Sequence, residues 1–408
     1  MSNHIDDLIA LGNRLNSTNY GPAPVVFERG EGMWLEDAHG QRYLDFVAGI
    51  AVCALGHRHP EMVRALSDQV DRLLHVSNMY WTAEQIGLME RLVNRSFADR
   101  VFFCNSGAEA NEAAFKLARR YQAKVAQRDD QRTILSMKKS FHGRTLAAIT
   151  ATGQPKYHDG FAPLPPAFKY TPFNDVAALE DSFDDTVGAV IVEPIQGEGG
   201  VKPADVAFLR ALRQRCDDTG ALLIFDEVQT GVGRTGSLFA YQHFGVTPDI
   251  MCLAKGLGGG VPVAATLATE EVWKGWKRGS HASTFGGNPL ATRAGAVVLD
   301  VIEEEGLLAN AADRGTQLQQ GLRHLASTYD VITDVRGEGL MVGAECGEAA
   351  SDLVALARQE GLLINSAGGN TLRFVPPLIV TADDVDDALS RLEAALRAWK
   401  KNSHGPTG

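Results

Sequence analysis

The sequence predicts an α/β protein built around a mostly parallel β-sheet, and two observations support this prediction. Between about residue 100 and residue 254, short apolar runs of strand length alternate with helical segments. Polar or glycine-rich residues follow several of these runs, at the sheet edge where α/β proteins bind their ligands. After about residue 290 the pattern changes to long helices and then short strands. A chain of 408 residues has room for two or three domains, or for one large domain with an appendage.

The predicted elements follow in order along the chain. Residues 24–46 are expected to form short strands separated by turns at Gly30, Gly32 and Gly40. Pro60 begins a helix. Its apolar positions follow helical spacing: Val63, Leu66, Val70, Leu73 and Leu74. Further strands are expected at 101–104, 133–136, 189–192, 222–225 and 250–254, with helices at 107–122 and 206–216. Short strands near 341–344 and 372–375 precede a last helix that ends near Trp399.

Composition and charge exclude several functional classes. The formal net charge is −11 and no basic run stands out, so no nucleic-acid partner is expected. No apolar run reaches the length of about 18 residues that a membrane span needs, and the amino terminus lacks the features of a signal peptide. The five cysteines are scattered without a CxxC pair, which favours a reducing compartment. We therefore expect a cytoplasmic protein without a membrane partner. His57 and His59 share one loop without an acidic or cysteine neighbour, so no metal site is expected.

Two residues point to a specific cofactor. Lys255 follows the apolar run 250–254 and precedes the glycine-rich segment 256–260, and Asp226 follows the apolar run 222–225. A lysine and an aspartate at the ends of two buried strands are the groups that pyridoxal phosphate needs. The lysine forms a Schiff base with its aldehyde, and the aspartate keeps its pyridine nitrogen protonated. A surface lysine and a solvated strand end are the alternatives, which the apolar runs make less attractive.

Three further segments suggest a binding site. Asn105-Ser106-Gly107-Ala108 joins a strand to a helix, and such a helix start can hold a phosphate, although serine and asparagine also cap ordinary helices. Glu193 ends a strand, and Glu198 follows between glycines, as in a ligand loop or in an acidic surface turn. Arg144 could bind a carboxylate through two parallel hydrogen bonds or form a surface ion pair.

Together, these segments resemble the class III (subgroup II) pyridoxal-phosphate-dependent aminotransferases. The similar stretches include NYGPAPVVFERGEGMWLEDAHGQRYLDF, NSGAEANEAAFKLAR, FHGRT, VEPIQGEGG, LLIFDEVQTGVGRTG, LAKGLGGGVPV, STFGGNP and RGEGLMVG. The resemblance covers roughly residues 15–400, and so many ordered segments are far more specific than one short motif. Within the family it is greatest for the acetylornithine and succinylornithine aminotransferases.

The resemblance implies roles for individual residues. Lys255 resembles the Schiff-base lysine that later moves the proton between carbons, and Asp226 resembles the partner of the pyridinium nitrogen. The implied cofactor-binding residues are Ser106, Gly107, Ala108, Phe141, Glu193, Asp226, Gln229, Lys255 and Thr284. Among them, Phe141 stacks on the ring, Gln229 lies near the ring hydroxyl, and Thr284 reaches the phosphate from a second subunit. The implied substrate-binding residues are Tyr20, Arg144, Glu198, Arg373 and Ser283.

The implied fold is fold type I of the pyridoxal-phosphate enzymes, with a large, mostly parallel sheet domain and a small α+β domain. We expect residues 1–58 to contribute an amino-terminal segment to the small domain, residues 59–300 to form the large cofactor-binding domain, and residues 301–408 to complete the small domain. The implied assembly is a homodimer with shared active sites.

The implied reaction moves the ω-amine of N2-acetyl-L-ornithine or N2-succinyl-L-ornithine to 2-oxoglutarate, giving the semialdehyde and L-glutamate in arginine metabolism. Glutamate carries two carboxylates, for which Arg373 near the reacting carbon and Arg144 at the distal end are suited. An ω-amine donor has no carboxylate beside its reacting carbon, so Glu198 would neutralise Arg373 in that half-reaction. Ile50 replaces the tyrosine of ornithine aminotransferases, which favours a donor whose α-amine is blocked.

Other functions remain open at this point. Ornithine, GABA or a lysine-derived ω-amine could be the donor, and a racemase or aminomutase would use the same cofactor without 2-oxoglutarate. A binding protein that kept the fold should have lost Lys255 or Asp226, and neither is lost. A nucleotide-binding enzyme is disfavoured because no GxGxxG segment opens a helix after the first strands.

Overall fold

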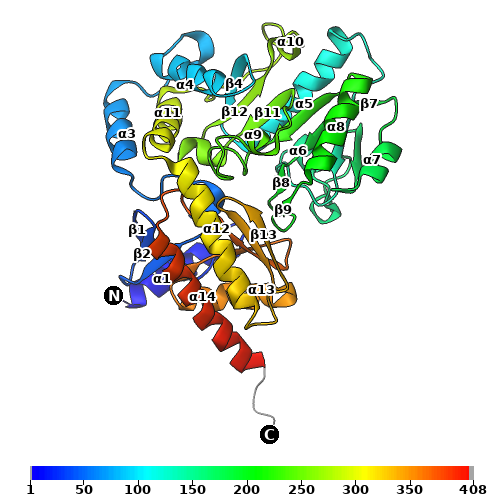
Figure 1. The fold of residues 1–408 in the computed structure, drawn as a ribbon. Coiled ribbons are helices and arrows are strands. Elements are labelled where there is room, and N and C mark those ends of the chain that lie inside the picture. Colours follow the sequence, from blue (N-terminus) through cyan, green and yellow to red (C-terminus); the bar gives the residue numbers. More distant parts are fainter. Residues whose placement is uncertain (1, 404–408) are drawn as a thin grey trace.

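A seven-stranded sheet occupies the upper part of the molecule in Figure 1, within a computed structural model that describes residues 2–403. Its strands, in spatial order, are β4 (Arg100–Cys104), β12 (Ala264–Ala268), β11 (Ile250–Leu253), β10 (Leu222–Asp226), β7 (Val187–Val192), β5 (Thr133–Met137) and β6 (Phe168–Thr171). Only β12 runs antiparallel to its neighbours in this sheet. The mostly parallel sheet and its five expected strands are confirmed, whereas β6 and β12 were not predicted.

Helices cover both faces of this sheet. Ile224 of β10 belongs to one apolar cluster with residues of α5 (Gly107–Lys124), whereas Leu223 and Phe225 belong to another with residues of α8 (Val206–Thr219). Because successive side chains of a strand point to opposite faces, α5 and α8 must cover opposite faces. Shorter helices lie between the strands: α6 (Leu146–Ala151), α7 (Val176–Ser182), α9 (Ala240–Phe244) and α10 (Glu270–Trp273). Both predicted helices, at 107–122 and 206–216, are confirmed.

Two smaller sheets form the lower part of the molecule and bring the two ends of the chain together (Figure 1). The first contains β1 (Phe27–Glu31), β2 (Trp34–Asp37), β3 (Arg42–Asp45) and β15 (Leu362–Leu363), and β15 pairs with β3 in parallel. The second contains β13 (Asp334–Glu338), β14 (Met341–Glu345), β17 (Thr371–Phe374) and β16 (Asn365–Ala367). The helices packed nearby are α12 (Leu307–Ala326), α13 (Ala350–Gln359) and α14 (Ala382–Ser403). The last helix therefore ends four residues beyond the predicted Trp399.

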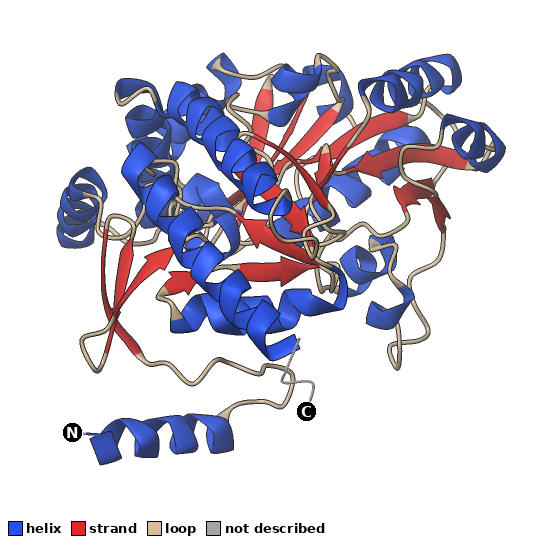
Figure 2. Ribbon diagram, turned by 60° about the horizontal axis from the view of Figure 1, so that its bottom comes forward, coloured by secondary structure: helices blue, strands red, loops and turns tan. Residues whose placement is uncertain are grey.

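Two helices leave apolar side chains uncovered in the single chain. The predicted helix at Pro60 is present as α3 (Pro60–Arg72), which packs with α4 (Ala83–Asn94) around α11 (Pro289–Glu304). Its buried side chains are Met62, Ala65 and Gln69, however, whereas Val63 and Val70 are 46% and 53% exposed. Helix α1 (Ser2–Leu15) stands apart from the body of the molecule in Figure 2. Among residues 2–403, no helix has the length and apolarity that crossing a membrane requires.

Candidate active site

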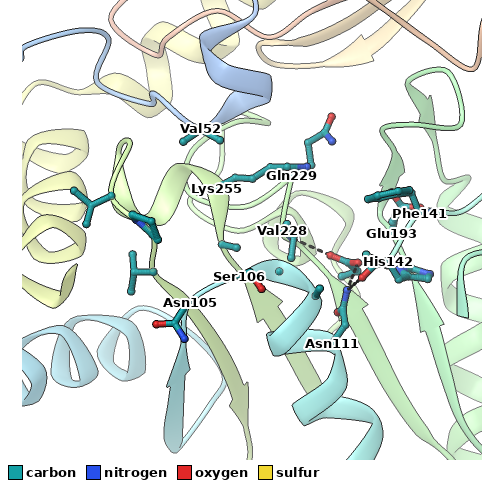
Figure 3. A pocket seen from close by; sticks show the side chains of 18 of the residues that line it. Val52, Asn105, Ser106, Asn111, Phe141, His142, Glu193, Val228, Gln229 and Lys255 are labelled. Carbon is teal, nitrogen blue, oxygen red and sulfur yellow. Dashed lines mark hydrogen bonds and ion pairs between the residues drawn. The ribbon is translucent and has the colours of Figure 1, made fainter. Parts of the chain in front are cut away.

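A cavity of about 330 Å³ opens where the carboxyl ends of the parallel strands meet (Figure 3). Residues at or just after the ends of β4, β7, β10 and β11 line it, as expected of a ligand site in an α/β sheet. Its walls include eight of the residues singled out from the sequence: Ser106, Gly107, Ala108, Phe141, Glu193, Asp226, Gln229 and Lys255. Strand topology thus gathers segments that lie up to 149 residues apart in the sequence.

Asp226 is a buried carboxylate held by three neighbours. It points to the same face of β10 as Ile224, which is the face covered by α5. Its Oδ2 accepts a hydrogen bond from Asn111 Nδ2 and lies 2.8 Å from His142 Nδ1, while its Oδ1 accepts the backbone N–H of Val228 at 3.0 Å. Only 4% of Asp226 is exposed. These donors fix the carboxylate as an acceptor at the base of the cavity.

Asn111 and His142 were not predicted to be site residues, although the sequence carries a signal for each. Asn111 lies three, four and seven residues before Ala114, Phe115 and Ala118, all of which are buried, so it is a polar residue on the apolar face of a helix. Its Nδ2 also donates to the backbone oxygen of His142 at 2.8 Å. His142 stands within the FHGR segment, where only the phenylalanine and the arginine were considered.

Lys255 begins a short 3₁₀ turn, one residue after the end of β11. Its φ of +41° is rare for a residue with a side chain, and such strained conformations gather at functional sites. Burial lowers the pKa of Lys255, and the nearby charge of Arg373 lowers it further, against the opposing effect of Glu198, Asp226 and Glu193. A lysine with a lowered pKa is more often neutral, and the neutral amine is the nucleophile.

Glu193 connects two loops behind the cavity. Its Oε2 accepts the backbone N–H of Phe141 at 3.0 Å and its Oε1 accepts that of Gly197 at 3.3 Å. Burial raises the pKa of Glu193 well above its ordinary value, and the neighbouring Asp226 raises it further. The contacts hold the Phe141 ring at the cavity wall, where Figure 3 shows it.

The amino terminus of α5 faces the cavity. Ser106 is its N-cap, and the Ser106 hydroxyl accepts the N–H of Glu109 at 3.2 Å. The Ser106 side chain therefore caps the helix, as the alternative to phosphate binding predicted. A Cβ on Gly107 would lie 2.7 Å from Cγ1 of Val228, which explains why a glycine stands there. Because the first N–H groups of a helix have no partners within it and carry a positive partial charge, this end of α5 suits a phosphate.

Arg373 and Glu198 form an ion pair next to the cavity. Arg373 Nη1 donates to Glu198 Oε1 at 2.5 Å and to Gln229 Oε1 at 3.2 Å, while Nε donates to Asn365 Oδ1 at 3.1 Å. Arg373 is 1% exposed, whereas the Glu198 side chain is 26% exposed. Burial alone would raise the pKa of Glu198, but the charge of Arg373 and its hydrogen bond lower it below its ordinary value.

Besides Glu198 and Arg373, which lie next to the cavity, four more of the implied residues lie outside its walls: Tyr20, Arg144, Ser283 and Thr284. Tyr20 is 73% exposed, and Ser283 and Thr284 line a neighbouring hollow that also contains Asn105. The guanidinium of Arg144 lies 4.1 Å from the ring centre of Tyr157 and 5.3 Å from that of Phe141, and it pairs with no carboxylate of the described residues. A single chain therefore does not bring Tyr20, Ser283 or Thr284 into the cavity.

A left-handed turn borders the cavity. Ala48, Gly49, Ile50 and Ala51 all have φ between +49° and +66°, and Val52 at its end lines the cavity. The Oδ1 of Asp45 accepts the N–H groups of Val47 and Ala48, both at 2.9 Å. Its Oδ2 lies 2.8 Å from His57 Nε2, whereas His59 contacts the carboxylate of Glu305. The two histidines of the loop therefore have separate acidic partners.

The cavity fits pyridoxal phosphate chemically. Four groups that this cofactor needs surround the same cavity: a buried carboxylate, a lysine with a lowered pKa, an aromatic ring at the wall, and a helix amino terminus with free N–H groups. Because Gly107 has no Cβ, the backbone can lie close to Val228 and leave its N–H groups accessible to an anion.

Comparison with known proteins agrees with this assignment. The sequence profile of the family described as aminotransferase class-III matches residues 15–396. The chain belongs to the class-III aminotransferases. It is 51% identical over 378 residues to the acetylornithine aminotransferase of Caldanaerobacter subterraneus subsp. tengcongensis, covering 92% of this chain and 96% of that relative.

Two solved structures resemble this aminotransferase closely. The N-acetylornithine aminotransferase of Stenotrophomonas maltophilia K279a has a TM-score of 0.84 and 39% identity, covering 97% of this chain and 100% of the other. An ornithine aminotransferase of Toxoplasma gondii, with pyridoxal phosphate at partial occupancy in its active site, has a TM-score of 0.95 and 34% identity, covering 98% and 96%. The fold-type-I architecture expected from the sequence is confirmed.

Proposed function

We propose that this class-III aminotransferase moves the ω-amine of N2-acetyl-L-ornithine, or of N2-succinyl-L-ornithine, to 2-oxoglutarate. The products are the semialdehyde and L-glutamate. The main support is the 51% identity to an acetylornithine aminotransferase along nearly the whole of both chains, together with the Lys255–Asp226 cavity. The cofactor is pyridoxal 5′-phosphate.

We assign residues of this chain to parts of the cofactor. Asp226 would hold the pyridine nitrogen, the amino terminus of α5 at Gly107 and Ala108 would hold the phosphate, and Phe141 would cover one face of the ring. Lys255 would hold the aldehyde carbon. When bound, pyridoxal phosphate supplies an electron-accepting ring and a carbonyl group that takes up the amine. Asp226 keeps a proton on the ring nitrogen, and the Lys255 amine moves a proton between the two carbons that exchange the amino group.

The Arg373–Glu198 pair provides the two charge states that the two substrates need. Paired with Glu198, Arg373 is neutralised beside the apolar methylenes of an acylated ornithine. Released from Glu198, it can bind the α-carboxylate of glutamate with two parallel hydrogen bonds. We assign the distal carboxylate of both substrates to Arg144, whose guanidinium has no carboxylate partner among the described residues.

The left-handed turn supports an acylated donor over free ornithine. Ile50 is 40% exposed at φ +66° in the turn that leads to Val52, although Ile50 itself does not line the cavity of the single chain. An isoleucine cannot accept a hydrogen bond from a free α-ammonium, whereas it can pack against an acyl methyl group.

Kinetics on three donors test the substrate assignment. N-acetylornithine, N-succinylornithine and ornithine are each assayed with 2-oxoglutarate, with glutamate as the measured product. We expect kcat/KM for at least one acylated donor to exceed that for ornithine by about two orders of magnitude, because a buried ammonium without a partner costs several kcal/mol. Preference for free ornithine would refute the assignment.

Separate half-reactions test the Arg373–Glu198 switch. Glu198→Ala should spare or improve the half-reaction with glutamate and weaken that with N-acetylornithine, since methylenes would then face an unpaired guanidinium. The cost is on the order of 3–5 kcal/mol for a fully buried pair, less with water access. Arg373→Ala should show the opposite bias. Equal losses in both half-reactions for Glu198→Ala would mean that the pair is only structural.

We also propose a homodimer with shared active sites. Exposed apolar side chains gather between residues 70 and 81, at the end of α3 and after it, and at residue 285: Val70, Leu73, Leu74, Met79, Tyr80, Trp81 and Phe285. Exposed apolar patches of this kind usually bind another protein. His75 contacts Phe285 with ring centres 5.5 Å apart, and Thr284 is its neighbour, so a second copy on this surface would meet the segment assigned to the phosphate of the other subunit.

Two further proposals concern location and domains. We propose a cytoplasmic location, supported by five free cysteines, four of them buried. We propose the division into an amino-terminal segment, 1–58, a large domain, 59–300, and a carboxyl-terminal part, 301–408. The parallel pairing of β15 with β3 supports a small domain built from both chain ends.

A further inference from the structure

The loop that carries Glu198 is the tip of a hairpin that lies across another sheet. Strands β8 (Ile195–Gln196) and β9 (Lys202–Pro203) form the hairpin, and residues 197–201 form its tip. The sheet beneath is β13-β14-β17-β16, which carries Arg373 on β17. The Glu198–Arg373 pair therefore joins two separate structural elements, and its geometry depends on how the hairpin sits on the sheet.

One cross-strand row of this sheet receives the hairpin tip. In the antiparallel register Arg336 of β13 lies opposite Gly343 of β14, Gly343 lies opposite Arg373 of β17, and Arg373 lies opposite Asn365 of β16. Directly paired residues present their side chains on the same face. The two arginines therefore flank a glycine, with the hairpin tip above all three.

Each member of the row contacts a different part of the tip. Arg373 binds Glu198 at one end. A Cβ on Gly343 would lie 2.8 Å from Cβ of Val201, so the absence of a side chain there lets the tip settle onto the sheet. Arg336 Nε donates to the carbonyl oxygens of Gly200 and Val201, both at 3.1 Å, and its Nη2 donates to Gly200 at 2.6 Å.

The rest of the Arg336 guanidinium is anchored to its own sheet. Nη2 also donates to Thr371 Oγ1 at 3.1 Å and to Glu345 Oε2 at 2.6 Å, and Nη1 donates to Asp334 Oδ2 at 2.6 Å. The side chain is 16% exposed. The planar guanidinium is held by carboxylates on one side and by two backbone carbonyls on the other. A lysine has a single ammonium group and cannot make the same set of contacts in a fixed geometry.

We propose that Arg336 is a positioning residue that docks the 197–201 tip onto the sheet and thereby sets the strength of the Glu198–Arg373 ion pair. It acts through the tip and touches no reacting atom. The proposal rests on the proposed switch between two half-reactions. Without the hydrogen bonds from Arg336 to Gly200 and Val201, Glu198 is less well positioned, so the Glu198–Arg373 ion pair opens more readily. A substitution of Arg336 should therefore weaken the half-reaction with N-acetylornithine relative to that with glutamate, as Glu198→Ala should, but by a smaller factor.

The test compares Arg336→Lys with Asp334→Asn in the full holoenzyme. Arg336→Lys keeps the charge between Asp334 and Glu345 but loses the two-carbonyl fork. Asp334→Asn weakens the anchor of the same guanidinium and leaves both carbonyl contacts. Single-turnover absorbance of each half-reaction is the readout. We expect Arg336→Lys to lower the ratio of the N-acetylornithine rate to the glutamate rate by about tenfold, roughly the effect of one lost hydrogen bond to a charged group. Asp334→Asn should leave the ratio within about twofold.

A double variant separates positioning from general damage. If Arg336 acts through Glu198, then Arg336→Lys should change the ratio little in a Glu198→Ala background, because coupled residues are not additive. The same tenfold change in that background, or equal losses in both half-reactions, would overturn the proposal.

Hydrogen exchange distinguishes failure of this proposal from failure of the switch. Arg336→Lys should speed amide exchange in residues 197–201 whether or not the switch operates. If exchange becomes faster but Glu198→Ala affects the two half-reactions equally, the switch is refuted and the docking role of Arg336 stands. Unchanged exchange would refute the docking role itself.

Discussion

Two adjacent carboxylates, Asp226 and Glu227, allow a matched test of the cofactor site. Both are buried, but they point in different directions from the end of β10. Asp226 faces the cavity, whereas Glu227 lies outside its walls and accepts the N–H groups of Ala240 and Tyr241 at 2.5 and 2.8 Å. At a pH above 7, where Glu227 is mostly ionised, Asp226→Asn and Glu227→Gln each replace a carboxylate by an amide of nearly the same shape.

The hydrogen bonds give the expected magnitude. In Asp226→Asn either amide orientation places an NH₂ against a donor, because Val228 N–H faces Oδ1 and Asn111 Nδ2 faces Oδ2. The same conflict arises in Glu227→Gln with two backbone donors. Each unsatisfied buried donor costs about 1–3 kcal/mol, so both variants should lose similar stability, a few degrees in Tm.

Turnover should separate the two variants. Asp226→Asn should lose at least about three orders of magnitude in kcat with N-acetylornithine, because an amide cannot keep the ring nitrogen protonated. Glu227→Gln should retain kcat within about tenfold. The assays are thermal unfolding of the apo forms and steady-state glutamate production. Near-normal turnover by Asp226→Asn, or equal losses of turnover in the two variants at matched stability, would refute the assignment of Asp226.

Three other predictions follow from the same structure. Burial raises the pKa of Glu227 from 4.5 to about 7. The folded state therefore binds more protons than the unfolded state, so the free energy of unfolding of the wild type should fall by up to ~3 kcal/mol as the pH rises from 4.5 to 7. The Tm of Glu227→Gln relative to that of the wild type should rise between pH 5 and 8. Lys255→Ala should still bind the cofactor, seen by its visible absorbance after gel filtration, while turnover vanishes; transamination near the wild-type rate would show that Lys255 is not the essential amine. Trp81→Asp should dissociate the proposed dimer in sedimentation and release cofactor, whereas the exposed control Phe161→Asp should not. An active, cofactor-saturated Trp81→Asp monomer would contradict the shared site.

The parts of the fold that the sequence predicted are those with a strong local signal. The β10 and β11 runs are apolar on both faces, as central strands of a covered sheet are, and both were located within one residue. Strand β12 was missed because Ala264–Ala268 contains no large apolar or aromatic residue except Leu267 and follows a glycine-rich segment. It runs antiparallel to β11, the strand before it, and its other neighbour, β4, lies more than 150 residues away in sequence.

The site was predictable where function leaves its mark on one segment, and less so where it depends on contacts between segments. Lys255 and Asp226 stand out because each ends an apolar run. The role of Arg336 has no local signal, because its partners are backbone carbonyls of a hairpin 135 residues earlier. Carbonyl acceptors carry no residue identity, so no reading of side-chain types could have found them.

The exposed face of α3 is an observation that supports the proposed dimer. The apolar spacing at Val63 and Val70 correctly predicts a helix, yet these side chains point away from the chain's own core, while Gln69 points into it. Periodicity reports that a face is apolar and does not report what covers it. In the same region Thr284 lies outside the cavity of its own chain. In the proposed dimer, a second copy bound on the exposed face would explain both observations, because it would bury the apolar side chains and bring Thr284 to the phosphate end of its neighbour's cavity.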